Sequence, residues 1–187
     1  TIHLPLREAA LVRKEAIVNA IRLTQDALRN DFGIRRPKIA VAGLNPHAGE
    51  EGIFGDEEKR EALPAVELAR EEGIDVSGPY PADTLFYKLK KKAFDAAVAL
   101  YHDQALIPIK LLAFGKGVNV TVGLPFVRTS VDHGTAYDIA GKGIADPGSF
   151  REARIAGDRG AAGECAQAAA GGRRRCLRCV GGIPRGA

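Results

Sequence analysis

The sequence has little of several features that would place a protein in a special class. It contains no Met and only three cysteines, Cys165, Cys176 and Cys179, all near its end. Disulfide bonds therefore cannot hold the preceding residues together, as they do in small secreted domains. No apolar run approaches the roughly 20 residues of a membrane-spanning helix, so we expect no membrane association. These features predict a reduced, cytoplasmic protein. Because the sequence begins with Thr and contains no Met, we expect it to begin inside a longer gene product.

Large apolar residues are scarce after residue 150. Gly, Ala and Arg fill 25 of the 37 positions from 151 to 187. This segment holds eight Arg and three acidic residues, a surplus of five, so the net charge of +4 leaves −1 for residues 1–150. Such a composition cannot bury enough apolar surface to fold, and a shifted reading frame would also produce it. We therefore predict a domain at 1–150 and a disordered tail at 151–187.

Two features of this tail could bind a partner. Cys176 and Cys179 have the spacing of half a zinc site, but the sequence offers no second pair. The run Arg173, Arg174 and Arg175 could touch nucleic acid, but no aromatic side chains are interleaved with it. We favour a solvated tail and expect no nucleic-acid partner.

Residues 1–150 have the pattern of a packed α/β domain, in a sequence that is 45% hydrophobic and 27% charged. Apolar residues at helical spacing predict one long helix over 6–30, and further helices are predicted over 56–72 and 82–92. Short apolar or β-branched runs predict strands over 38–43, 74–79, 94–101 and 118–124. This alternation predicts a mostly parallel sheet with flanking helices, in which ligands bind at the carboxyl ends of the strands.

All four histidines lie within two positions of Pro, Gly or Asp, in settings typical of loops. His47 and His102 directly follow predicted strands, and His3 precedes Leu4 and Pro5. Neutral imidazole binds zinc and similar divalent ions, and three such ligands leave coordination positions open for a substrate. The alternative for each is an ordinary loop histidine with a hydrogen-bond partner.

Two carboxylates lie near these histidines in the predicted sheet. Asp83 and Asp103 could each orient a metal-bound histidine or move a proton, so both are candidate catalytic residues. Asp83 also precedes a predicted helix, so the alternative is that it caps this helix.

A second set of polar residues flanks the strand predicted over 118–124. Lys110, Asn119 and Arg128 could together bind a phosphorylated small molecule, with Arg128 as a bidentate partner of the phosphate. Surface solvation is the alternative for Lys110 and Arg128. The following stretch, residues 132–143, is rich in Gly and allows close backbone approach to a planar ligand, but lacks the Gly-x-Gly-x-x-Gly dinucleotide motif.

Five runs of sequence carry a family resemblance, in the order HLPL at 3–6, VAGLNPHAGE at 41–50, DVSGPYPADTLF at 75–86, YHDQALIPIKLLAF at 101–114 and GVNVTVGLPFVRTSVDHGTAYDIAGKGIADPGS at 117–149. They closely resemble the 4-hydroxythreonine-4-phosphate dehydrogenase family of pyridoxal phosphate synthesis. The resemblance covers about residues 1–150 and corresponds to the second half of the family's chain. It implies the fold of isocitrate and isopropylmalate dehydrogenases.

The resemblance implies a role for each candidate residue. The family's metal-binding histidines fall on His3, His47 and His102, and its substrate-binding residues fall on Lys110, Asn119 and Arg128. The cofactor loop of the related dehydrogenases falls on His133, Gly134, Thr135, Ala136 and Asp138. The resemblance also implies a homodimer, because the family builds each site from both chains.

The expected function is the oxidation of 4-phosphohydroxy-L-threonine with decarboxylation to 3-amino-2-oxopropyl phosphate. The expected cofactors are NAD or NADP and a divalent metal, zinc, magnesium or cobalt. Part of the family's site lies in the amino-terminal half, which this sequence lacks, and the tail replaces the helix that follows GIADPGS in the family. We therefore expect the isolated chain to be inactive. The alternatives are a related dehydrogenase for a phosphorylated four-carbon sugar acid or a cis-dihydrodiol, and a metal-binding fragment without turnover.

Overall fold

A parallel sheet forms the centre of the first part of the fold. The computed structural model describes residues 3–124, 126, 128–161 and 179–180. Strand β1 (Ile39–Ala42) lies between β2 (Val76–Tyr80) and β3 (Ala96–Val98), and both neighbours run parallel to it. All four residues of β1 are buried, as expected of a strand covered on both faces. The predicted α/β class and flanking helices are confirmed.

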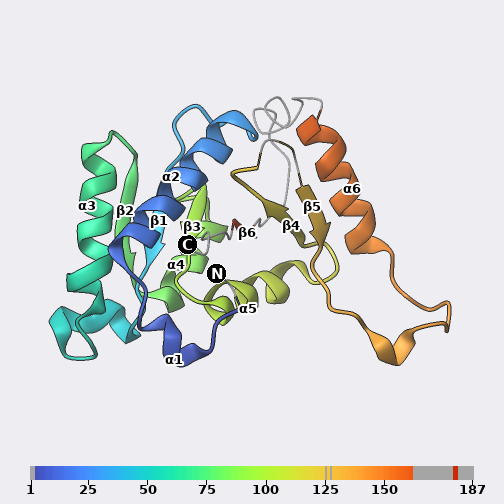
Figure 1. Cartoon of the computed structure of the whole chain (residues 1–187), viewed down its shortest axis with the longest axis horizontal. Coiled ribbons are helices and arrows are strands. Elements are labelled where there is room, and N and C mark those ends of the chain that lie inside the picture. The colour runs from blue at the N-terminus through green and yellow to red at the C-terminus, as the bar shows by residue number, and fades with distance from the viewer. Residues whose placement is uncertain (1–2, 125, 127, 162–178, 181–187) are drawn as a thin grey trace.

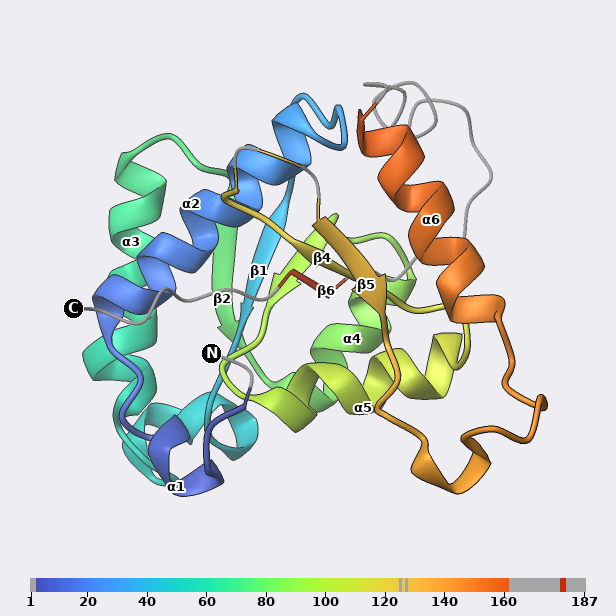
Figure 2. The same ribbon diagram turned by 45° about the vertical axis from the view of Figure 1, so that its right-hand side comes forward.

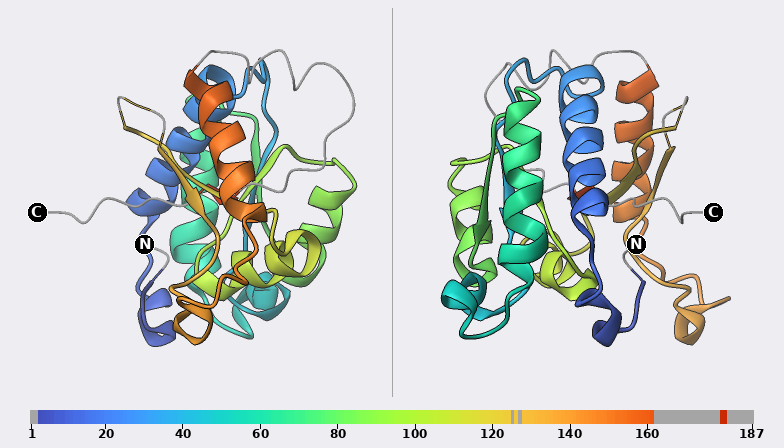
Figure 3. Two further views of the ribbon diagram at one scale, coloured as in Figure 1. Left: turned by 90° about the vertical axis from the view of Figure 1, so that its right-hand side faces the viewer. Right: turned by 60° about the vertical axis from the view of Figure 1, so that its left-hand side comes forward.

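Alternate residues of β1 face two different helix layers. Ile39 and Val41 pack with apolar residues of α2 (Lys14–Asn30) and α3 (Leu63–Glu71), which lie side by side in Figure 3. Ala40 and Ala42 point to the opposite face and pack against Leu85 of α4 (Ala82–Lys90). The larger side chains therefore fill the two-helix layer, and the alanines allow the single helix to approach closely.

The amino-terminal segment differs from the single helix predicted over 6–30. A short helix, α1 (Leu6–Ala9), is separated from α2 by a turn, and Arg13 has extended backbone angles. The backbone N–H of Lys14 donates to Glu61 at 2.7 Å. The helix breaks because a carboxylate distant in sequence caps the first free N–H of α2, a tertiary contact that helical periodicity cannot reveal.

The remaining predicted elements of this part are confirmed with shifts of a few residues. The predicted helix over 56–72 consists of η2 (Glu58–Ala62) followed directly by α3. The segment between β1 and η2 contains the tight turn η1 (Pro46–Gly52). Helix α5 (His102–Ala113) follows β3 after a short loop and includes Pro108. Both β1 and β3 thus end at the same edge of the sheet, next to η1 and α5.

A second sheet lies beside the first. Strand β4 (Val118–Thr121) pairs antiparallel with β5 (Arg128–Val131) and parallel with the two-residue strand β6 (Cys179–Val180). Helix α6 (Gly148–Ala161) covers this hairpin (Figure 2). Its Ala153 packs on Val118 and Val120. The loop between β5 and α6 contains η3 (Tyr137–Ile139).

The prediction of a disordered tail from residue 151 is wrong for two segments. Residues 151–161 form most of α6, where the side chain of Ala153 is 5% exposed. Residues 179–180 form β6. Composition misled because an alanine-rich helix can be held by packing on a sheet even when it has few large apolar residues. Cys165, Cys176 and the run Arg173 to Arg175 lie outside the described residues.

The helices of the described residues include none that is both long and apolar enough to cross a membrane.

Candidate functional site

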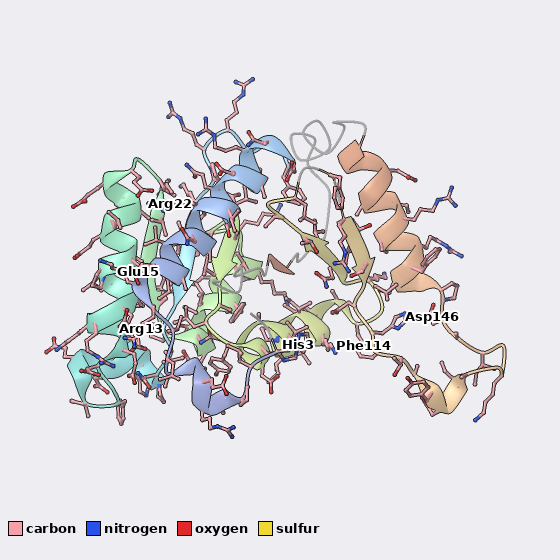
Figure 4. All side chains as sticks on the ribbon, in the orientation of Figure 1. His3, Arg13, Glu15, Arg22, Phe114 and Asp146 are labelled. Atoms are coloured by element: carbon pink, nitrogen blue, oxygen red, sulfur yellow. The ribbon has the colours of Figure 1, made fainter. Side chains whose placement is uncertain are left out.

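Two of the three predicted metal ligands lie together at the edge of the first sheet. His3 precedes α1, and His102 is the first residue of α5. Their ring centroids are 5.1 Å apart, with 50° between the ring planes. Figure 4 shows His3 beside α5. Tertiary folding thus brings together two imidazoles that lie far apart in the sequence.

Asp103 holds the ring of His102. Its Oδ1 lies 2.6 Å from Nδ1 of His102. This contact favours the tautomer with the proton on Nδ1, which leaves the lone pair of Nε2 for a ligand. Asp83, the other candidate carboxylate, is exposed in the first turn of α4. The residue at the N-cap position of α4 is Pro81, so Asp83 does not cap the helix as the alternative had it.

His47 lies in a left-handed turn. The φ values of His47, Ala48, Glu50 and Glu51 are 53°, 54°, 40° and 58°. Left-handed backbone at a residue other than Gly costs about 1 to 3 kcal/mol and persists only where surrounding contacts enforce it. The ring of His47 is exposed, and its centroid is 5.9 Å from that of Phe54. The turn therefore depends on the contacts that hold it.

A buried carboxylate supplies several of these contacts. Oε1 of Glu58 accepts the backbone N–H of Asn45 at 2.6 Å, and Oε2 accepts the side-chain amide of Asn45 at 2.8 Å. The same amide donates to Glu57 at 2.7 Å and thereby lowers the pKa of that carboxyl. The lowered pKa means that this contact stabilises the fold above the ordinary pKa of a glutamate, and its contribution is lost as the pH falls through the lowered value.

Gln104 links the two strand ends that carry His47 and His102. Its side chain is 7% exposed. Its amide Nε2 donates to the carbonyl of Gly43 at 2.6 Å, and its Oε1 accepts the N–H of Leu100 at 2.7 Å. The first contact reaches the residue after β1, and the second reaches the loop after β3. The start of α5 is thereby fixed to the loop that leads to His47.

Within the described parts of the chain, no three His, Cys, Asp or Glu side chains are placed to hold a metal ion together. His3 and His102 form a pair, whereas His47 contacts Phe54. One copy of the chain therefore provides two neighbouring imidazoles and a third on a separate turn. The donor types suit a borderline divalent ion such as zinc, but in the described residues no third donor joins His3 and His102.

The second sheet brings together two of the three predicted substrate-binding residues. Asn119 pairs with Ser130 across the hairpin, and Thr121 pairs with Arg128. Asn119 and Arg128 consequently share the face opposite to the one that packs on α6. Nη1 of Arg128 donates to Oγ1 of Thr121 at 2.8 Å, which holds the guanidinium over this face. Lys110 is exposed near the end of α5, on a different element.

The predicted cofactor loop projects from the second sheet. All residues from 133 to 138 are exposed, and Figures 1 and 2 show this segment extending away from the body of the fold. Nδ1 of His133 lies 3.0 Å from the carbonyl oxygen of Gly134. Ala136 has a φ of 47°, a left-handed conformation directly before η3. The loop thus offers backbone and polar groups to a ligand but makes few contacts of its own.

Sequence reasoning missed the buried polar residues beneath the histidines. Asn45, Glu58 and Gln104 were not among the candidates. A signal for Glu58 was present, because it lies in helical register with the buried residues Ala62, Ala65 and Ala69. A charged residue in an otherwise apolar stripe needs a partner, and the partner here is the turn that carries His47.

A model of the family described as "Pyridoxal phosphate biosynthetic protein PdxA" matches residues 1–156. The chain is 58% identical over 147 residues to 4-hydroxythreonine-4-phosphate dehydrogenase of Paracoccus denitrificans, which covers 78% of this chain and 46% of that protein. The chain thus spans about half the length of the curated relatives that it matches.

The fold is also similar to that of solved structures. A crystal structure of 4-hydroxythreonine-4-phosphate dehydrogenase from Klebsiella pneumoniae superposes with a TM-score of 0.77 and 46% identity, covering 85% of this chain and 48% of that one. A terephthalate 1,2-cis-dihydrodioldehydrogenase from Burkholderia xenovorans superposes with a TM-score of 0.65 and 35% identity, covering 83% of this chain and 50% of that one.

Proposed function

Because the chain belongs to the PdxA family of pyridoxal phosphate biosynthetic proteins, we propose that it forms part of the site of a cytoplasmic 4-hydroxythreonine-4-phosphate dehydrogenase. The proposed reaction is the NAD(P)-dependent oxidation of 4-phosphohydroxy-L-threonine, followed by decarboxylation to 3-amino-2-oxopropyl phosphate. The observation that carries the proposal is the pairing of His3 with His102, from two family motifs far apart in sequence, 5.1 Å apart at the edge of the sheet.

His3, His47 and His102 are the proposed ligands of a divalent metal. Imidazole ligands favour zinc or cobalt over magnesium, which prefers oxygen. A bound metal would polarise the substrate oxygen during oxidation and stabilise negative charge during decarboxylation. The contribution of this chain is orientation: Asp103 fixes the ring of His102, and Gln104 holds α5 against the end of β1.

Arg128 and Asn119 are proposed to bind the substrate phosphate and its neighbouring polar groups. Their shared face on the hairpin and the contact of Arg128 with Thr121 support this role, because a guanidinium held in one orientation can grip phosphate bidentately. Lys110 is proposed to bind the substrate and to take the proton that the hydroxyl loses while hydride leaves its carbon. Asp83 is an alternative proton carrier.

The exposed loop carrying His133, Gly134, Thr135, Ala136 and Asp138 is proposed to bind NAD or NADP. The cofactor accepts the hydride, so the loop needs only to hold it in the correct orientation. Exposure of every residue from 133 to 138 supports this role, since the loop keeps its backbone and polar side chains open to a ligand.

We also propose that two copies of the chain form the complete site. Ile107 and Leu111 lie one helical turn apart on α5, Phe114 directly follows the helix, and the three residues are 63%, 83% and 82% exposed. This apolar face lies on the helix that begins at His102. A second copy packed against it could bring its own histidine close to His3 and His102. Association through this face would explain why one chain does not assemble three ligands.

Leu111→Asp is expected to weaken self-association at least tenfold. Removing one fully buried Leu from an interface costs about 1.5 to 3 kcal/mol, and a carboxylate adds a desolvation cost. Sedimentation equilibrium over a concentration series measures the change. Tyr87→Asp on α4, where Tyr87 is 62% exposed, serves as the control and should leave association unchanged. A Leu111→Asp chain as dimeric as the unmodified one would exclude α5 from the interface.

A second candidate is a related dehydrogenase acting on a cis-dihydrodiol, favoured by the structural match to the Burkholderia xenovorans enzyme. NADH production distinguishes the two, with 4-phosphohydroxy-L-threonine and a cis-dihydrodiol as substrates. A longer version that restores the other half of the curated relatives should oxidise the phosphorylated substrate, and the chain alone should not. Activity only on the dihydrodiol would favour the second candidate, whereas turnover by the chain alone would show that it needs no other segment.

A further inference from the structure

We propose that Glu58 is a positioning residue for His47, holding the left-handed turn in the one conformation that presents this imidazole to the metal. The inference rests on the proposed function, which makes His47 a metal ligand. It assigns a role to a residue that lies outside the family motifs used to identify the site. Its basis is the set of contacts between one buried carboxylate and both sides of the turn.

The backbone of the turn is strained. Four of its residues other than Gly have positive φ, although the N–H groups of Ile53 and Phe54 donate to the carbonyls of Glu50 and Gly49 at 3.2 and 3.1 Å. Left-handed backbone is disfavoured for residues with a side chain, so an isolated segment of this sequence would leave this conformation. External contacts must therefore select it.

The carboxylate of Glu58 provides these contacts on both sides of His47. On the amino-terminal side it accepts the backbone N–H and the side-chain amide of Asn45, at 2.6 and 2.8 Å. On the carboxyl-terminal side it lies against Gly49, where an added Cβ would be 2.8 Å from Oε2. Glu58 thus contacts the residues two positions before and two positions after His47.

The burial of Glu58 makes this arrangement specific. Glu58 is 4% exposed, and none of the described Lys, Arg or His side chains forms an ion pair with it. Its hydrogen-bond donors in the described residues come from Asn45 alone. A buried carboxylate is costly unless donors reach it, so the turn is favoured only in the conformation that aims Asn45 at Glu58.

Glu58 lies shortly before a helix that packs into the core. Element η2 continues directly into α3, whose residues Ala65, Val66 and Ala69 are completely buried in the main core. The position of Glu58 is therefore set by a packed helix. Gln104 ties α5 to Gly43, at the start of the same loop. The contacts of Glu58 and Gln104 thereby hold His47 and His102 in place relative to the same core, although the two histidines lie on separate elements.

The test compares Glu58→Gln with Glu61→Gln. Both carboxylates lie on η2 and accept a backbone N–H from a distant residue, but Glu61 accepts that of Lys14 at the start of α2. The same change at Glu61 should cost similar stability without reaching the turn. Zinc affinity is measured on this chain by competition with a chromophoric chelator, at a temperature where circular dichroism shows all variants folded. Amide hydrogen exchange at Asn45 is measured in parallel without metal.

Glu58→Gln should weaken zinc binding about tenfold, within the range seen when groups supporting metal ligands are removed, and should accelerate exchange at Asn45. Glu61→Gln should leave both unchanged. Equal zinc affinity and unchanged Asn45 exchange in Glu58→Gln would overturn the inference, as would an equal loss in both variants. If the unmodified chain binds no zinc at a concentration at which it self-associates, the proposed metal site fails, and Asn45 exchange alone then decides whether Glu58 holds the turn.

Asn45→Ala provides a second variant in case Glu58→Gln does not fold. It removes the side-chain donor but keeps the backbone N–H that Glu58 accepts. Its loss of zinc affinity should be smaller than that of Glu58→Gln, and the double variant should lose less than the product of the two single losses, because both act through one contact. Multiplicative losses would show that Glu58 acts elsewhere than through Asn45.

Discussion

Replacing His102 by alanine is expected to remove the bound divalent metal and abolish dehydrogenase activity together in the complete enzyme. His102 is one of the two imidazoles that lie 5.1 Å apart, and its ring is oriented by Asp103. Loss of one of the three proposed protein ligands would leave too few to retain the ion, so activity should fall at least a thousandfold, about 4 kcal/mol of transition-state stabilisation. Elemental analysis of the purified variant measures the metal directly.

His133→Ala is the matched control for this experiment. His133 lies in the exposed loop of the second sheet, and its Nδ1 lies 3.0 Å from the carbonyl oxygen of Gly134. This variant should keep its metal and instead require more NAD for half-maximal rate. A His102→Ala enzyme with normal metal content would remove His102 from the ligand set, whatever its activity.

Arg128→Lys is expected to lower kcat/KM by about 10- to 150-fold in the complete enzyme. Lysine keeps the positive charge but lacks the planar fork that grips phosphate bidentately, and a hydrogen bond to a charged group contributes about 1.5 to 3 kcal/mol. The change also removes the bond from Nη1 to Thr121 that holds the side chain over the polar face of the hairpin. Steady-state kinetics with varied phosphorylated substrate give the effect.

Arg154→Lys on α6 makes the same chemical change away from the proposed site. Arg154 is exposed and pairs loosely with Asp158 at 3.8 Å, so its replacement should leave kcat/KM unchanged. Unchanged kinetics in Arg128→Lys would instead assign Arg128 to the solvated surface, the alternative that its exposure also allows.

Much of the fold follows from local pattern. The run at 38–43 is apolar without alternation and becomes β1, buried on both faces, and the helical spacing of Ile17, Ile21 and Leu28 becomes the inner face of α2. The pattern did not reveal the break before α2, which Glu61 enforces from a distant element. It also did not reveal α6, whose few large apolar residues suffice because the hairpin covers one of its faces.

The sequence also reveals only some of the residues of the candidate site. The histidines at strand ends could be recognised because polar residues that follow buried parallel strands gather at one edge of the sheet. The residues that hold these histidines in place could not be recognised. Asn45 and Gln104 are ordinary amides in the sequence, and their role depends on groups from other elements: Glu58 for Asn45, and Gly43 and Leu100 for Gln104.

Local sequence is enough to show which residue types are available, where strands and helices can form, and which family the motifs resemble. It could do so because side-chain periodicity and short motifs depend on neighbours along the chain. Three features emerge only when the chain folds: His3 lies next to His102, His47 lies on a separate turn, and Asn119 shares a face with Arg128. These outcomes depend on strand order, register and buried hydrogen bonds between distant residues, whose energies exist only once the chain has folded.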